Sequence, residues 1–141
     1  MSAAIYFVVP GNPQGKGRPR ASSRGGFVRM YTPATTLAYE AEIARIAEMA
    51  RGDWPVLQTP MALRVTAYHG IPVSWSKRKK LDALAGHIVP GKPDLDNVAK
   101  AVLDALNGVI YADDKQVIRL VAEKEYSIDP RIEVYVHEVL E

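Results

Sequence analysis

The chain has 141 residues, of which 48% are hydrophobic and 24% charged, and its net charge is +2. This length and composition predict one folded globular domain over residues 1–141. The absence of cysteine excludes disulfides, zinc–thiolate sites and thiol nucleophiles, and the absence of a signal-peptide pattern or a long apolar run predicts a cytoplasmic protein without a membrane segment.

The first third of the chain predicts a strand, a long loop and a helix. Residues 4–9 form an apolar run ended by a Pro-Gly pair, which predicts a buried strand. Residues 10–26 are rich in Gly, Pro, Arg and Ser and are expected to form a loop that is mobile without a ligand. Residues 27–31 suit a short strand. Apolar residues at helical spacing predict a helix over 34–51, ended by Gly52.

The rest of the chain adds three strands and two helices. Alternation predicts a strand over 61–69, and Ser74 is the expected N-cap of a short basic helix over 75–85. A strong helix is expected over 95–106. Residues 116–126 and 131–139 are predicted to pair as a hairpin around an Asp-Pro turn. This order indicates an α+β fold with helices packed on one mixed sheet.

Basic residues gather in two places. Five precede the first acidic residue, Glu40, and four more occur in the basic helix. Half of the 18 lysines and arginines belong to these two groups. Such segregation is typical of a polyanion binder, although solvated loops and a charged surface helix explain the charge alone equally well. The candidate DNA-binding residues are Lys16, Arg18, Arg20, Arg24, Arg29, Lys77, Arg78, Lys79 and Lys80.

The helix over 95–106 has a narrow polar stripe. Counted from Asp96, its polar residues lie at sequence positions that fall on one side of the helix when each residue turns by about 100°. The rest of its surface is apolar. A helix of this kind is buried on most sides, so the stripe must line a cleft or an interface. The stripe comprises Asp96, Asn97, Lys100, Asp104 and Asn107.

Two acidic residues mark the start of this helix. Asp94 and Asp96 would point in different directions inside a helix, but at a helix N-terminus both can turn toward one point. A simple N-cap would account for one of these aspartates. It would not account for two, with Lys100 one turn further along the stripe.

Asp113 and Asp114 follow a short apolar run and precede a strand. Alone, such a pair is most often a turn signal. Together with Asp94 and Asp96 it supplies a third carboxylate, and carboxylates without cysteine suit Mg²⁺ or Mn²⁺. The predicted metal ligands are therefore Asp94, Asp96, Asp113 and Asp114. Lys100 is placed to neutralise phosphate charge or to help activate water.

Other motifs carry no function. The run from Gly11 to Lys16 has three residues between its glycines rather than the four of a phosphate-binding loop, and Gly17 replaces the required Ser or Thr, so no nucleotide cofactor is expected. His69, His87 and His137 have no ligand spacing and are interpreted as structural.

The acidic element resembles a known signature. Asp94-Leu95-Asp96-Asn97, Lys100 and Asp104-Ala105-Leu106, followed by Asp113-Asp114 and Gln116-Val117, are similar to the signature of the RusA family of Holliday junction resolvases. Lys16-Gly17-Arg18-Pro19-Arg20 and Tyr31-Thr32-Pro33 are similar to the N-terminal region of the phage and prophage branch. The run of arginines that some members carry before the first Asp is absent, and only Lys92 is present.

This resemblance implies an enzyme and a site. It implies a homodimeric endonuclease that nicks opposing strands of a four-way DNA junction with Mg²⁺ or Mn²⁺, in recombination and repair. It assigns catalytic roles to Asp94, Asp96, Asp114 and Lys100. The alternatives are a nuclease for flaps or forks and a non-catalytic DNA-binding module whose acids only cap a helix.

Overall fold

The fold is built on a four-stranded mixed sheet. The computed structural model describes residues 3–17, 20–26, 28–31 and 33–140. The strands of this sheet, in spatial order, are β1 (Ala4–Pro10), β6 (Arg131–Glu138), β4 (Met61–Gly70) and β5 (Val117–Ser127). The helices are α1 (Ala34–Arg51), α2 (Lys77–Leu84) and α3 (Leu95–Ala105), and a short 3₁₀ turn, η2, covers Asp114–Gln116. The predicted α+β class is confirmed.

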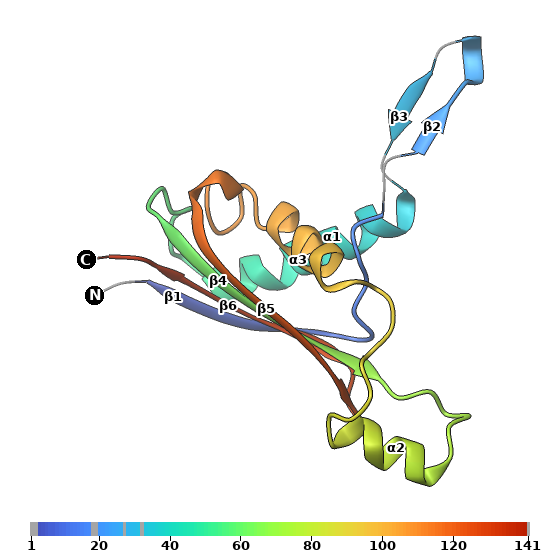
Figure 1. The fold of residues 1–141 in the computed structure, drawn as a ribbon. Helices are drawn as coiled ribbons and strands as arrows, with labels where there is room; N and C mark the ends of the chain where they lie inside the picture. The colour runs from blue at the N-terminus through green and yellow to red at the C-terminus, as the bar shows by residue number, and fades with distance from the viewer. Residues whose placement is uncertain (1–2, 18–19, 27, 32, 141) are drawn as a thin grey trace.

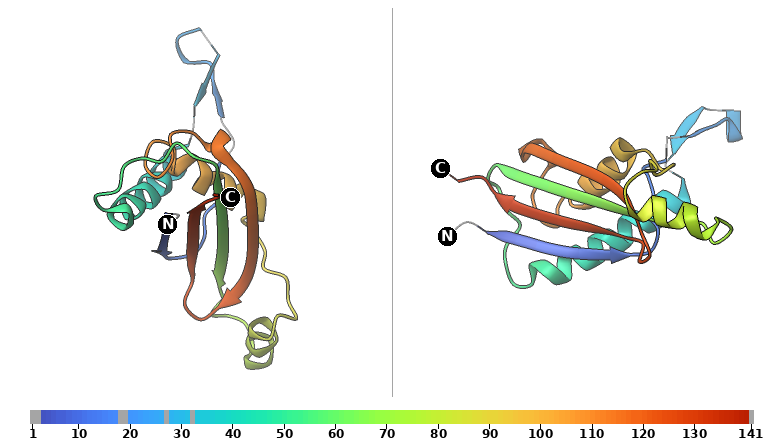
Figure 2. Two further views of the ribbon diagram at one scale, coloured as in Figure 1. Left: turned by 90° about the vertical axis from the view of Figure 1, so that its left-hand side faces the viewer. Right: turned by 60° about the horizontal axis from the view of Figure 1, so that its bottom comes forward.

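The hydrophobic core lies between the sheet and two helices. Figure 2 shows α1 and α3 on the same face of the sheet, and no helix of the described part of the chain covers the opposite face. Alternation places every second strand residue toward the helices. Burial of these apolar residues offsets the conformational entropy that the chain loses on folding. Val65 and Val134 face each other across neighbouring strands and are fully buried, as are Ile43 of α1 and Val102 of α3.

The predicted hairpin of β5 and β6 is wrong. β4 lies between them, paired in parallel with β5 and antiparallel with β6. The reason is burial, because β4 has inward residues that are almost fully buried along its length, from Met61 to Ala67. A strand with such inward residues buries most apolar surface at the centre of a sheet. The short connection from Ser127 to Arg131 is long enough to cross β4 and reach β6.

An arm projects from the body where a loop was predicted. β2 (Arg20–Ser22) pairs antiparallel with β3 (Arg29–Tyr31), and the 3₁₀ turn η1 (Arg24–Gly26) joins them. Figures 1 and 2 show this hairpin extending away from the sheet. The loop prediction is therefore wrong at residues 20–22. These strands are paired by backbone hydrogen bonds, and three residues are too few to show an apolar alternation in the sequence.

The basic helix begins two residues later than predicted. Ser76, not Ser74, caps α2, since its Oγ accepts a hydrogen bond of 3.2 Å from the backbone N–H of Lys79. The N–H of Trp75 instead donates to the carbonyl of Pro72 in a preceding turn. Among the described residues, no helix combines the length and apolarity that a membrane crossing requires.

Candidate active site

The polar stripe of α3 is present as predicted. Five small or branched apolar residues of the helix are buried, whereas Asp96, Lys100 and Asn107 are exposed. The buried face packs on α1, β4 and β5. The helix therefore displays one line of polar side chains at the surface. The buried residues are Val98, Ala99, Ala101, Val102 and Ala105.

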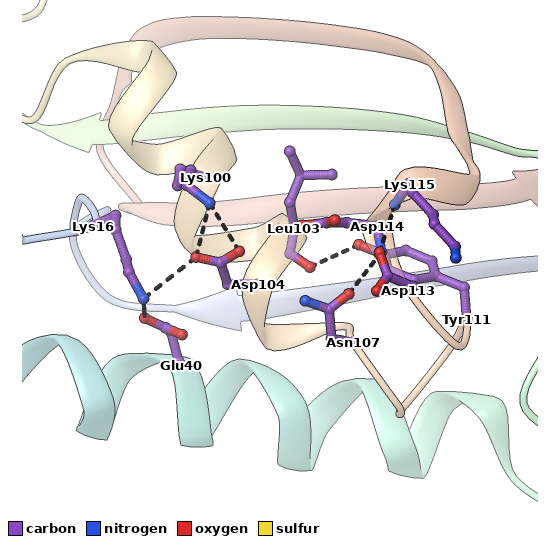
Figure 3. A network of polar contacts seen from close by, with 10 residues as sticks. All are labelled: Lys16, Glu40, Lys100, Leu103, Asp104, Asn107, Tyr111, Asp113, Asp114 and Lys115. Atoms are coloured by element: carbon purple, nitrogen blue, oxygen red, sulfur yellow. Dashed lines mark hydrogen bonds and ion pairs between the residues drawn. The ribbon is translucent and has the colours of Figure 1, made fainter. Parts of the chain in front are cut away.

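A chain of alternating charges crosses the middle of this stripe (Figure 3). Lys100 Nζ lies 3.1 Å and 3.2 Å from the two carboxylate oxygens of Asp104. Asp104 also pairs with Lys16 Nζ at 3.3 Å, and Lys16 donates to Glu40 of α1 at 2.7 Å. Lys100 keeps 58% of its side chain exposed, so it remains accessible from solvent.

Lys16 joins the N-terminal segment to both helices. Its side chain is only 21% exposed, and its backbone N–H donates to the carbonyl of Asn97 at 2.8 Å. Burial alone would lower the pKa of Lys16, but the hydrogen bonds to Glu40 and Asp104 outweigh it and leave this pKa raised. The ammonium is thus paired without DNA. Its predicted contact with DNA stays a prediction.

Among the described residues, the first acid of α3 makes no capping hydrogen bond with its side chain. Asp94 occupies the N-cap position, and within the described part of the chain its backbone carbonyl, not its carboxylate, accepts the N–H groups of Asn97 and Val98. Asp96 lies in the first turn, and both aspartates are exposed. An N-cap therefore does not explain the Asp94 carboxylate, which leaves it available to a ligand.

Asp113 and Asp114 have different local roles. Asp113 Oδ1 accepts from the N–H of Lys115 at 2.9 Å, and Gln116 Oε1 accepts from the N–H of Asp113 at 2.9 Å. This is a reciprocal capping box, so the turn interpretation fits Asp113. Asp114 is held by its backbone, whose N–H donates to Asn107 Oδ1 at 2.8 Å. Among the described residues, no hydrogen bond or ion pair to the Asp114 carboxylate is present.

This turn is firmly attached to its surroundings. Gln116 Nε2 donates to the carbonyls of Leu57 and Thr59 at 3.0 Å and 2.9 Å. The buried Tyr111 donates its hydroxyl proton to the carbonyl of Leu103 on α3 at 2.8 Å. Burial raises the pKa of Tyr111, and the negative charges of Asp114, Asp104 and Asp113 raise it further. Tyr111 therefore remains a neutral hydrogen-bond donor that fixes the turn to α3.

The candidate metal ligands fall into two groups at opposite ends of α3. Asp94 and Asp96 stand at its N-terminus, and Asp114 contacts Asn107 just beyond its C-terminus. An 11-residue helix is about 16 Å long. Within the described part of the chain, no three His, Asp or Glu side chains lie close enough together to hold a metal ion. One copy of the chain therefore does not bring these acids to one point.

The two basic groups lie in separate elements. Lys77, Arg78 and Lys79 are exposed on α2, and Lys80 is half-buried. The arm contributes positions 20, 24 and 29, in β2, η1 and β3. Arg18 lies outside the described residues. Apart from Lys16, the structure thus places those predicted DNA-binding residues that it describes on two projections of the body.

The contacts of Gln116 and Glu40, which shape the site, were absent from the sequence prediction. The D-x-x-Q spacing of Asp113 and Gln116 is a capping signal that the sequence does carry. Glu40 offered no such signal, because its partner Lys16 is distant in the sequence. His69 was interpreted as structural, and it lies buried at the end of β4.

Comparisons with known proteins identify the class to which this fold and site belong. The family described as endodeoxyribonuclease RusA matches residues 10–137, which is nearly the whole chain. The protein belongs to the RusA endodeoxyribonuclease family. A Bacillus subtilis (strain 168) protein, described as the uncharacterized protein YqaN, is 43% identical over 138 residues and covers 96% of both chains.

Proposed function

We propose that the protein is a metal-dependent endonuclease that resolves four-way DNA junctions as a homodimer in recombination and repair. The observation that carries this proposal is the set of carboxylates at the two ends of α3. Asp94, Asp96 and Asp114 lack side-chain partners among the described residues, although they flank a helix that is otherwise well packed. Membership of the RusA family supports cleavage of DNA as the activity.

The chemistry of these donors suits Mg²⁺ or Mn²⁺. Both ions prefer carboxylate and water oxygens, and the site offers carboxylates with no cysteine. When bound, such an ion would activate water and stabilise the extra charge on the reacting phosphate. Asp94, Asp96 and Asp114 would hold the ion. Asp113 contributes less, because one of its oxygens already accepts the N–H of Lys115.

Two copies of the chain would complete the site. A two-fold axis that sets two α3 helices antiparallel brings the N-terminus of one helix beside the C-terminus of its mate. Asp94 and Asp96 of one copy would then meet Asp114 of the other, twice per dimer. A four-way junction is also close to two-fold symmetric, and opposing nicks require two equivalent sites.

The strand next to Asp114 supports such an association. β5 starts directly after the η2 turn and forms an edge of the sheet. Its residues Ile118, Leu120 and Val121 keep 62%, 44% and 40% of their surface exposed. Exposed apolar residues on an edge strand favour contact with a second chain. This surface would bring a partner to the C-terminal end of α3.

The lysines would act on the phosphate and on the DNA backbone. Lys100 lies on the same stripe as Asp96 and is held by Asp104, so its ammonium is placed to neutralise charge on a phosphate. The arm and α2 would grip the flanking duplexes. Replacing Lys77, Arg78 and Lys80 with Gln should lower the slope of log affinity against log salt by about 3, since each lost phosphate contact removes about 0.9.

The test is cleavage of a synthetic four-way junction with Mg²⁺, with Mn²⁺ and with a chelator. We expect paired nicks on opposing strands with either metal, and intact DNA with the chelator. Equal cleavage of flaps and junctions would replace junction resolution with a broader activity on branched DNA. Binding without cleavage under every metal condition would identify a non-catalytic DNA-binding module.

A further inference from the structure

A cavity lies beside the start of α3, on the helix-covered side of the sheet. Its volume is about 270 Å³, and its walls include Asn12, His69, Gly91, Lys92 and Tyr126. The segment that leads into α3 forms one wall, so the cavity is only two residues from Asp94. It has room for roughly nine water molecules, close to the number of non-hydrogen atoms in one nucleobase.

His69 is an unpaired polar group in this cavity wall. The residue is only 6% exposed, and Nε2 is buried without a hydrogen-bond partner among the described residues. Burial lowers the pKa of His69, and the nearby Lys124 lowers it further, so the ring is neutral at pH 7. A buried nitrogen without a partner destabilises the fold, so a ligand that pairs with it is favoured. A neutral imidazole nitrogen that can donate or accept fits the edge of a base, whereas a phosphate would need a donor in every case.

A second polar group beside His69 is held in a fixed orientation. Asn12 Oδ1 accepts from the backbone N–H of Gly70 at 2.8 Å, which leaves its amide nitrogen as a donor. A Cβ at position 70 would lie 2.7 Å from this oxygen, so a larger residue there would displace the Asn12 side chain. An amide donor and an imidazole nitrogen in one wall are the kinds of group that read a base edge.

The remaining surroundings are aromatic and cationic. Tyr126 pairs with His69 across β5 and β4, and its ring contacts Trp75 edge to face, with centroids 5.4 Å apart. Lys79 Nζ lies 4.0 Å from the centre of the Trp75 ring. Aromatic rings with interspersed cations are typical of surfaces that bind single-stranded nucleic acid. They also connect the basic helix α2 to the cavity.

We propose that the His69 cavity binds one unpaired nucleobase of a DNA strand whose backbone passes from α2 to Asp94 and Asp96. This inference rests on the proposed function, because it places that base next to the strand to be cut. Asn12 would bond the base edge, and the His69 ring would turn as the base enters so that its buried Nε2 reaches the same edge. Lys92 at the rim would meet the backbone phosphate. The protein would thereby select DNA with an unstacked base, such as the crossover of a junction.

The experiment combines a protein change with a DNA change. Equilibrium binding is measured in chelator for wild type and His69→Phe, on an intact junction and on junctions with one abasic position moved stepwise around the crossover. We expect His69→Phe to weaken binding to the intact junction about tenfold. One abasic position should weaken wild-type binding similarly, and the two changes together should have no additional effect.

His137→Phe is the matched control, since His137 lies in β6 at the opposite end of the sheet. Melting temperatures of both variants show that the fold is kept. The base-binding proposal is overturned if His69→Phe binds the intact junction as wild type does, or if the effects of His69→Phe and of the abasic position simply add. In either case, junction cleavage by the wild type would leave the proposed nuclease function standing. Failure of the wild type to bind any junction overturns both proposals.

Discussion

At the C-terminal end of α3, Asp114 belongs to a turn that Gln116, Asn107 and Tyr111 tie to the body. At the N-terminal end, Asp94 and Asp96 are exposed, and among the described residues the Asp94 side chain makes no capping hydrogen bond. One end is thus a rigid support for a single carboxylate. The other offers two carboxylates beside a cavity, and these have more freedom to adjust to a ligand.

The largest expected effect comes from the carboxylates themselves. Asp96→Asn and Asp114→Asn should each lower junction cleavage by at least about 100-fold while junction binding persists, because each removes charge that would hold the metal. Asp113→Asn is the matched control, since its amide oxygen can still accept the N–H of Lys115. Cleavage rates under single-turnover conditions separate the three variants. Equal losses in all three would remove the distinction between Asp113 and Asp114.

The next effect concerns stability at the centre of α3. Lys16→Met should lower the free energy of unfolding by about 1–3 kcal/mol, because it leaves the half-buried Glu40 and Asp104 carboxylates without their shared cation. Lys100→Met should cost only about 0.3–0.5 kcal/mol, as an exposed pair one helical turn apart. Urea unfolding measures both changes. A smaller loss for Lys16→Met than for Lys100→Met would contradict the assignment of Lys16 as the connecting residue.

Much of this arrangement was readable from the sequence. Apolar residues at helical spacing predicted α1 and α3. The positions of Asp96, Lys100 and Asp104 along the helix predicted the polar stripe. Strand order was not readable, because pairing is decided by how deeply each whole strand is buried, and β4 takes the centre for this reason. The separation of Asp94 from Asp114 also required the fold, since a signature in the sequence does not show which end of a helix each acid reaches.

The smallest effect is a pH dependence near the cavity. Burial lowers the pKa of His69 below its ordinary value of 6.5. The unfolded chain therefore takes up a proton below about pH 6.5 that the folded protein resists, and wild-type stability falls as pH decreases through this range. His69→Phe should show a shallower fall. Thermal melts between pH 7.5 and about 5 test this, and identical slopes for wild type and His69→Phe would exclude a buried neutral His69.

The central claim is that the two ends of α3 act together across two copies of the chain. Asp96→Asn and Asp114→Asn are each purified, mixed, allowed to exchange subunits, and assayed on a four-way junction with Mg²⁺. In the mixed dimer one site has lost both acids and the other has lost neither, so we predict single-strand nicks that neither variant produces alone. A mixture as inactive as its components would contradict the claim, because it would mean that each site takes all of its acids from one chain.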